Sequence, residues 1–223
     1  MKVIKDWAFA CDKDITDIII PDGVTVIGDN AFDGCINLKS VKLPDTVKRI
    51  GNNAFSDCVN LTDITIPDSV KSIGIIGTFS NCHSLKSVKI PNGVTNIGVC
   101  AFTNCSSLTS IIIPDSVTNI DDSAFKGCTS LTNITIPDGV TKIGDSVFDG
   151  CTSLTRVTIS KHVTDIGFNA FHNCTNLKSI AIPDSITSIG MFAFTGTSIT
   201  SITIPNNTNL WWGALDGITV SRK

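Results

Sequence analysis

Nine cysteines are the residues of this chain best suited to chemistry, because thiolates bind metals, form disulfides and act as nucleophiles. Eight of them recur at a nearly constant interval, at Cys11, Cys35, Cys58, Cys82, Cys105, Cys128, Cys151 and Cys174. None shows the C-x-x-C spacing typical of zinc sites. If successive units stack, neighbouring cysteines of this column would lie within disulfide range. Their side chains would point in parallel into a core, however, and this favours a ladder of free, buried thiols. Cys100 lies outside the column, and we expect it to be the most exposed and oxidisable thiol.

The other residues that could do chemistry do not converge. His83, His162 and His172 occupy unrelated places in the sequence pattern, so neither a metal site nor an activated nucleophile is expected there. No G-x-S-x-G, H-E-x-x-H, phosphate-loop or dinucleotide motif occurs. The sequence therefore predicts no catalytic residue, no cofactor and no metal ligand.

A column of acidic residues follows a column of prolines. It runs through Asp22, Asp45, Asp68, Asp115, Asp138 and Asp184. Carboxylates at such an interval could hold calcium between successive turns of the chain. Asn92, Asn206 and Lys161 take the same place elsewhere, however, and these replacements favour a role in capping a tight turn.

These columns belong to a repeat of about 23 residues, written C-x-x-L-x-x-I-x-I-P-D-x-V-x-x-I-G-x-x-A-F-x-x. Its leucine column runs through Ile15, Leu38, Leu61, Leu85, Leu108, Leu131, Leu154, Leu177 and Ile199. Two units are interpreted as one residue longer, between Cys11 and Cys35 and between Cys58 and Cys82. The segment L-x-x-I-x-I-P alternates apolar and polar residues and predicts a short strand that ends at proline. A turn, a second short apolar segment at V-x-x-I-G and one compact helical or 3₁₀ turn at x-x-A-F-x-x are expected next.

No single unit can bury its own apolar face, so the units must stack. We expect about nine stacked units in which each strand pairs in parallel with the equivalent strand of the next unit. Residues 1–205 are assigned to this solenoid, and residues 206–223 to an atypical C-terminal cap or tail. Because no segment keeps a 3.6-residue period over a full helix, a helical bundle is excluded.

The strands LTDITIP, LTSIIIP and LTNITIP are similar to those of leucine-rich repeats. The longer pattern IPDSVTxIGxxAFxxCxxLxSI resembles BspA-like leucine-rich repeats of bacterial and protist surface proteins, over nearly all of residues 3–205. The resemblance implies a β-rich (α/β) solenoid, a right-handed coil with a parallel sheet. It also implies a non-catalytic module for adhesion or recognition at a cell surface or outside the cell.

Net charge and the distribution of charged and apolar residues restrict the classes of expected binding partner. The net charge is −3 and the basic residues are scattered singly, so nucleic acid is not an expected partner. No apolar run approaches the length that crosses a bilayer, and MKVIKDWAFACDKD is too interrupted by charges for the apolar core of a signal peptide. We expect a protein partner from a host, a matrix or the cell's own surface, and leave the compartment open.

Candidate partner contacts lie where side chains are free of the core. The outward position between the two core residues of each strand runs through Ile19, Lys42, Thr65, Lys89, Ile112, Thr135, Thr158, Ala181 and Thr203. Lys42, Lys89 and Ile112 are candidates there, and their interruption of the threonines argues against an ice-binding ladder. Arg156 is a further candidate, and with Ser40, Asp63 and Ser110 it is expected on a neighbouring position that faces differently. A solvated face without a partner remains the alternative.

Breaks in the repeat supply the other candidates. Ile75 and Ile76 stand where polar residues are usual, either as a harmless bulge or as an apolar contact. Trp211 and Trp212 are expected to close the end of the core as a cap, with a tail presented to a partner or modifying enzyme as the alternative. The first strand edge is uncapped, so the molecule is expected to be a monomer or to associate weakly end to end. An intracellular scaffold and a carrier of the C-terminal tail stay open as functions.

Overall fold

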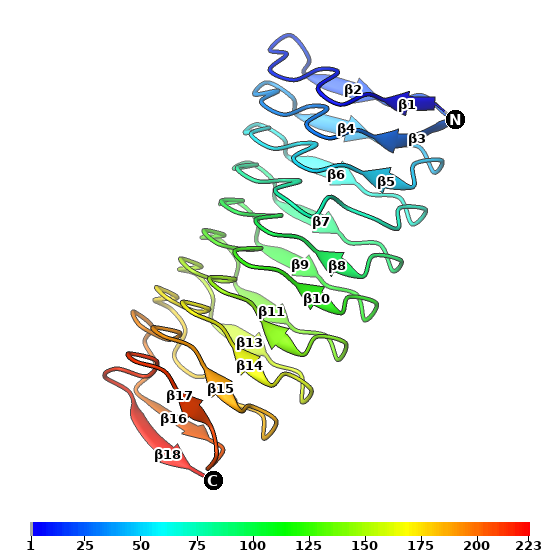
Figure 1. Cartoon of the computed structure of the whole chain (residues 1–223). Helices are drawn as coiled ribbons and strands as arrows, with labels where there is room; N and C mark the ends of the chain where they lie inside the picture. The colour runs from blue at the N-terminus through cyan, green and yellow to red at the C-terminus, as the bar shows by residue number, and fades with distance from the viewer. Residues whose placement is uncertain (1) are drawn as a thin grey trace.

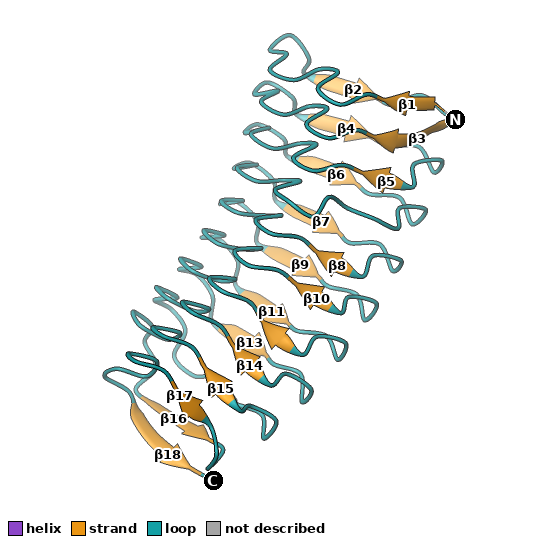
Figure 2. Ribbon diagram, viewed as in Figure 1, coloured by secondary structure: helices purple, strands orange, loops and turns teal. Residues whose placement is uncertain are grey.

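The computed structural model describes residues 2–223 as an elongated β-solenoid (Figure 1). Eighteen short strands form two rows that run along the length of the rod, joined by turns and loops (Figure 2). The first row contains β2 (Asp17–Ile19), β4 (Ser40–Lys42), β6 (Asp63–Thr65), β7 (Ser87–Lys89), β9 (Ser110–Ile112), β11 (Asn133–Thr135), β13 (Arg156–Thr158), β16 (Ser201–Ile204) and β18 (Thr219–Arg222). The second row contains β1 (Lys2–Ile4), β3 (Val24–Ile27), β5 (Arg49–Ile50), β8 (Asn96–Ile97), β10 (Asn119–Ile120), β12 (Lys142–Ile143), β14 (Asp165–Ile166), β15 (Ser188–Ile189) and β17 (Asn209–Leu210).

Every paired strand is parallel to its neighbour, which confirms the predicted stacking. In the first row the pairings run β2-β4-β6-β7-β9, β11-β13 and β16-β18. In the second row they run β1-β3-β5, β8-β10 and β12-β14-β15-β17. Residues one unit apart face each other, as Ser40 faces Asp17 in the register of β2 and β4. The solenoid is thus built from one contact between neighbouring units, repeated along the rod.

Apolar columns of identical residues fill the space between the two rows. Nine phenylalanines from Phe9 to Phe194 stack with ring centroids 5.1 to 5.7 Å apart and nearly parallel planes. The leucine column from Leu38 to Ile199 and seven cysteines of the predicted ladder are buried beside them, and Ile15 at the N-terminal end is partly buried. Each buried aromatic side chain removes a large apolar area from water and also contacts the ring above and below it.

The Pro-Asp segment forms the expected turn, but its acidic residue does not cap it. The amide of Val47 donates to the carbonyl of Pro44 at 3.1 Å, and equivalent bonds close the other turns. The residue after the acid links neighbouring units instead, as Thr46 donates through its hydroxyl to the carbonyl of Val24 at 2.7 Å. The acids are exposed, and Asp138, for example, accepts from the hydroxyl of Ser160. The turn-capping prediction for the acidic column is therefore wrong, because the neighbouring hydroxyl makes the link between turns.

The predicted helical or 3₁₀ turn at x-x-A-F-x-x is also wrong. Residues 2–223 contain no helix, and the segment is a pair of turns bracketed by two residues with positive φ. In the second unit these residues are Asn30 (φ 55°) and Gly34 (φ 70°). A left-handed residue on each side of Ala31 and Phe32 reverses the chain before a right-handed helix can continue.

Cys11 does not belong to the cysteine ladder. Its φ of 58° and the bond from its amide to the carbonyl of Asp33 match those of Gly34, whose amide donates to Ser56. Asp12 therefore takes the ladder position of this unit, and the interval from Phe9 to its partner Phe32 has the regular length. The prediction that this first unit is one residue longer is wrong. The unit has the regular length, and its cysteine lies one position before the ladder position.

The second long unit does contain an extra residue, at Ile75–Gly77. Only isolated bridges, Arg49 to Ser72 and Ile76 to Val99, connect the second row at this place. Thr78 replaces the core alanine and is fully buried, with its hydroxyl 3.3 Å from the carbonyl of Gly74. The break in the row between β5 and β8 is visible in Figure 1.

Candidate protein-interaction surfaces

The outer face of the first row carries four of the candidate residues predicted from the sequence. Strands β4, β6, β7, β9, β11 and β13 have the burial pattern exposed, buried, exposed, so that Ser110 and Ile112 of β9 point outward while Ile111 points inward. Lys42, Lys89 and Arg156 are exposed on the same face, and Ile112 is 78% exposed. The expectation that Arg156, Ser40, Asp63 and Ser110 face differently is wrong, because residues two apart in a strand share a face.

This strand face is polar and shallow. Hydroxyl, amide and guanidinium groups of Thr132, Asn133, Thr135, Arg156 and Thr158 line a hollow of about 560 Å³ between β11 and β13. Lys89 forms an exposed ion pair with Asp68 at 3.1 Å, which contributes little to stability. The hydrogen bond donated by Ser40 at 2.5 Å lowers the pKa of Asp17.

Ile75 and Ile76 lie elsewhere, on the side of the second row. They are 60% and 48% exposed, and Val99 of the next unit is exposed beside the bridge to Ile76. Their side chains lie outside the core. They form a small apolar surface at the break in the second row.

Trp211 and Trp212 do not close the core. They are 59% and 73% exposed, whereas Ala214 and Leu215 are buried at the end of the stack. The backbone around them is nevertheless paired, β17 with β15 and β18 with β16. The predicted indole cap is therefore wrong, and the exposed indoles lie directly after β17, in a loop between paired strands rather than in an unpaired tail.

The two indoles belong to a larger aromatic patch, defined here as Phe168, Met191, Phe192, Trp211 and Trp212. The ring of Phe192 packs edge-on against those of Trp212 and Phe168, at centroid distances of 4.9 and 6.1 Å. The indole nitrogen of Trp211 donates to the hydroxyl of Ser188 at 3.3 Å. Sequence reasoning missed Phe168 and Phe192, yet the signal was present: of eleven phenylalanines, only these two lie outside the stacked column.

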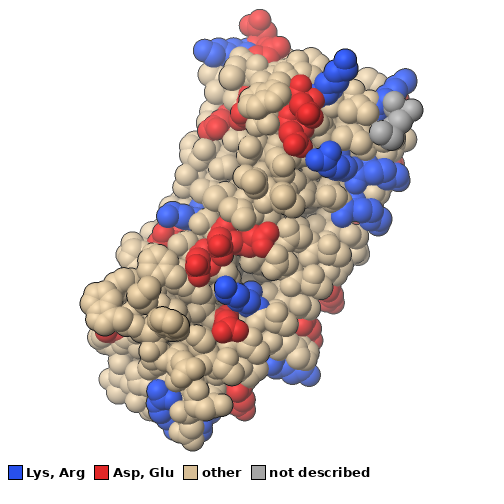
Figure 3. Space-filling model, viewed as in Figure 1, with Lys and Arg blue, Asp and Glu red and all other residues tan. Residues whose placement is uncertain are grey.

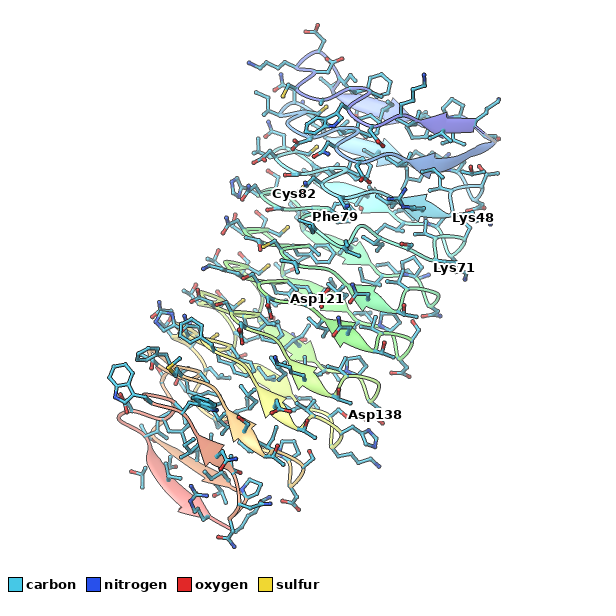
Figure 4. All side chains as sticks on the ribbon, in the orientation of Figure 1. Lys48, Lys71, Phe79, Cys82, Asp121 and Asp138 are labelled. Atoms are coloured by element: carbon cyan, nitrogen blue, oxygen red, sulfur yellow. The ribbon has the colours of Figure 1, made fainter. Side chains whose placement is uncertain are left out.

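An acidic group adjoins this patch on the same side of the molecule, defined here as Asp121, Asp122, Asp145 and Asp165. The amide of Phe168 donates to the side chain of Asp145 at 2.9 Å, and the amide of Asp145 donates to Asp122 at 2.7 Å. Figure 3 shows red atoms on this face, bordered by a tan area that has few charges. In Figure 4, Lys48 and Lys71 lie along the turns at one edge, while Asp121 lies inward from that edge.

The candidate residues therefore fall on three separate surfaces. Lys42, Lys89, Ile112 and Arg156 share the outer face of the first row. Ile75 and Ile76 project from the middle of the second-row side, and Trp211 and Trp212 from its C-terminal end. These separate surfaces do not form one binding site.

The cysteines of the ladder have a structural role in the core. Seven ladder thiols are free and fully buried, and each donates to the carbonyl of the phenylalanine one unit before, as Cys105 does to Phe79 at 3.1 Å. Burial raises the pKa of the Cys35 thiol to about 11 and that of Cys105 well above its usual value. Cys11 is the exposed thiol and Cys100 is half-buried, so the expectation that Cys100 is the most exposed is wrong. Within residues 2–223, no three His, Cys, Asp or Glu side chains are grouped so that they could hold a metal ion.

A family model for the BspA type leucine rich repeat region, in six copies, matches residues 2–126 and 96–211. The chain belongs to this family. This BspA-type chain is similar to a leucine rich cell surface protein from Faecalibacterium prausnitzii A2-165, with 27% identity, a TM-score of 0.56, and coverage of 100% of this chain and 83% of that one. It is also similar to a leucine rich repeat protein from T. pallidum, with 27% identity, a TM-score of 0.55, and coverage of 79% and 72%.

No curated protein matches this BspA-type chain in sequence. The parts of the chain that the structure describes include no helix with the length and apolarity needed to cross a membrane.

Proposed function

We propose that this BspA-type solenoid is a non-catalytic protein-interaction module that acts at a cell surface or outside the cell. The observation that carries the proposal is the aromatic patch, where two indoles and a phenylalanine ring stand exposed in the turns that follow paired second-row strands. Exposed clusters of this kind mark interaction sites, and tryptophan is enriched among the residues that dominate binding energy.

The solenoid is suited to this role for a physical reason. Its core columns hold the strands in register, so a surface side chain can change without loss of the contacts that stack the units. The cell-surface part of the proposal is supported by the name of the Faecalibacterium relative, a leucine rich cell surface protein.

A binding experiment tests the proposal and separates the surfaces. The folded chain is immobilised and exposed to labelled surface proteins from host cells, from matrix and from the organism itself. The double variant W211A/W212A is expected to lose the retained partner. The triple variant K42A/K89A/R156A tests the strand face, and T65A/T135A/T158A is its matched control on the same face.

Failure of the native chain to retain any protein above an unrelated solenoid would overturn the proposal. Retention that survives W211A/W212A but is lost in K42A/K89A/R156A would move the site to the first-row face.

A second candidate, an intracellular scaffold, is favoured by one observation. All nine cysteines are free, and Cys11 is exposed, as suits a reducing compartment. Fractionation of the producing organism distinguishes the two candidates: recovery of the protein only from the cell interior would favour the scaffold.

A further inference from the structure

We infer that the aromatic patch and the acidic group beside it bind an arginine- or lysine-bearing segment of the protein partner. This inference rests on the proposed function and assigns the chemistry of the partner at that site. The apolar stems of the basic side chains would lie on the aromatic patch, and their cationic heads would face the carboxylates.

The two groups are continuous because they occupy one column of the repeat. The second residues after the second-row strands in five successive units are Asp122, Asp145, Phe168, Met191 and Trp212. Side-chain-to-amide bonds connect the first three of them, from Asp122 to Asp145 and from Asp145 to Phe168. A change from acidic to apolar side chains therefore takes place between adjacent turns, within reach of a single bound segment.

A hollow of about 320 Å³ lies where the two groups meet. Its lining includes Phe168, Met191 and Trp211 on the apolar side and Asp145 and Asp165 on the acidic side. A planar indole is the ring that attracts a cation most strongly. The hollow thus combines the two features that select a basic side chain.

The charges of the acidic group are not neutralised within the described part of the chain. Asp29 of the same column pairs with Arg49 at 3.2 Å, and Asp149 pairs with Lys126 at 3.1 Å. None of Asp121, Asp122, Asp145 and Asp165 forms an ion pair within residues 2–223. Lys142 lies among them, so four carboxylates and one ammonium leave a net charge of about −3 on this surface. That surface attracts a cationic partner.

Three substitutions in otherwise regular columns of the repeat place unusual residues on or beside this surface. The residue before the Asp122 column is glycine in most units, because a Cβ at Gly190, for instance, would lie 2.6 Å from the backbone of Gly167. Asp121 and Trp211 replace that glycine, and both lie on this surface. Phe192 has a φ of 56° in a column otherwise held mostly by Asn, Ser or Gly, which is a strained conformation for a bulky residue.

The test measures peptide binding to the full chain through tryptophan fluorescence. The chain contains three tryptophans, so the background substitution Trp7→Phe leaves Trp211 and Trp212 as the only indoles. The probe is a short peptide in which arginine alternates with glycine. The reference peptides carry citrulline, which has the shape of arginine without its charge, or glutamate.

We expect the arginine peptide to bind about tenfold more tightly than the citrulline peptide and the glutamate peptide not to bind. The affinity should fall as salt is raised, because exposed charges are screened. The double variant D145N/D165N should weaken arginine binding about tenfold and flatten its salt dependence. Asparagine retains the acceptor oxygen for the amide of Phe168, so this variant is designed to keep the local fold.

The matched control is D22N/D115N, which removes the same charge from two exposed turn positions that line neither hollow of this surface. It should leave binding unchanged within about twofold, as expected for screened distant charges. Trp211→Ala should abolish binding, and its circular dichroism spectrum reports whether the strands persist. A loss in D22N/D115N equal to that in D145N/D165N would overturn the inference, because the effect would then be one of total charge.

The remaining outcomes separate this inference from the proposed function. Equal binding of the arginine and citrulline peptides would reject a cationic partner while leaving an apolar docking site. A fluorescence change on raising the concentration of the chain alone, with dimerisation in sedimentation, would show that a second copy covers the patch. Retention of a protein partner through Trp211 and Trp212 without any peptide binding would reject the inference and keep the proposed function.

Discussion

The interior and the outside of this solenoid follow different rules. Inside, one residue type repeats through most units, as in the stack of phenylalanines and the ladder of thiols. Outside, the same column changes from Asp122 to Phe168 to Trp212 within a few units. The difference shows that the stacking contact determines the fold, while the exposed positions can differ between units without affecting that contact.

The largest effect expected from this comparison is the loss of one ring from the middle of the stack. Phe102→Ala should lower the free energy of unfolding by about 4 kcal/mol, because it removes a buried ring and leaves a cavity between Phe79 and Phe125. Ile112→Ala on the strand face should change it by less than about 0.5 kcal/mol. Urea denaturation of both variants measures the two values, and equal losses would contradict the division between interior and surface.

The thiol ladder should make the protein sensitive to alkali. Burial raises the pKa of Cys105 well above its usual value, and neighbouring Cys82 raises it further. The unfolded thiol releases its proton at about pH 8.5, before the folded one does, so the stabilising contribution is complete below that pH and falls as pH rises. Each such thiol should add a slope of about −1.4 kcal/mol per pH unit to the free energy of unfolding.

The control for this slope is Cys105→Ala. Urea denaturation from pH 8 to 10 should show a shallower decline in the variant than in the native chain. The chain has no tyrosine, so phenol ionisation does not contribute. Parallel curves for the two proteins would show that the ladder thiols are not held protonated by the fold.

The regular columns could be predicted from the sequence because their period fixes both register and burial. Apart from Phe9 and Ile15 in the first unit, the Leu and Phe columns are buried as the period indicates, and so are seven of the eight ladder cysteines. Cys11 was misplaced because a cysteine one position early looks like a longer unit. The backbone conformation shared with Gly34 reveals its true place, and the regular interval from Phe9 to Phe32 agrees with it.

Other features depend on how the units stack, and they are harder to recognise in the sequence. The left-handed position that prevents a helix is held by Asn30, Cys100, Ser123 and Phe192 in different units, so no single residue type identifies it. The acidic group was missed because its members are spread over 45 residues and meet only when the units stack. Trp211 and Trp212 were expected to cap the end of the core because solenoids need an atypical final unit, but the core at that end is already filled by Ala214 and Leu215.

A smaller effect is expected at the left-handed positions themselves. Asn104 has a φ of 58°, and Asn104→Ala should destabilise the protein by about 1 to 2 kcal/mol relative to Asn104→Gly. Both variants lose the side-chain bond to Asn81, so their difference isolates the backbone. Thermal unfolding of the pair measures this difference, and equal stability would mean that the turn relaxes to another conformation.

The smallest effect on stability is expected from Cys11→Ser. Thiol labelling should show the largest difference in reactivity between exposed and buried cysteines. In the native protein Cys11 should react with a thiol reagent such as DTNB first and half-buried Cys100 more slowly, while the seven ladder thiols react only after unfolding. Cys11→Ser should remove the fast phase and change the free energy of unfolding by less than about 0.5 kcal/mol. A fast phase that persists in Cys11→Ser would place another thiol at the surface. Rapid reaction of Cys105 in the native state would mean that the units separate within the time of labelling, because its thiol lies between two stacked turns.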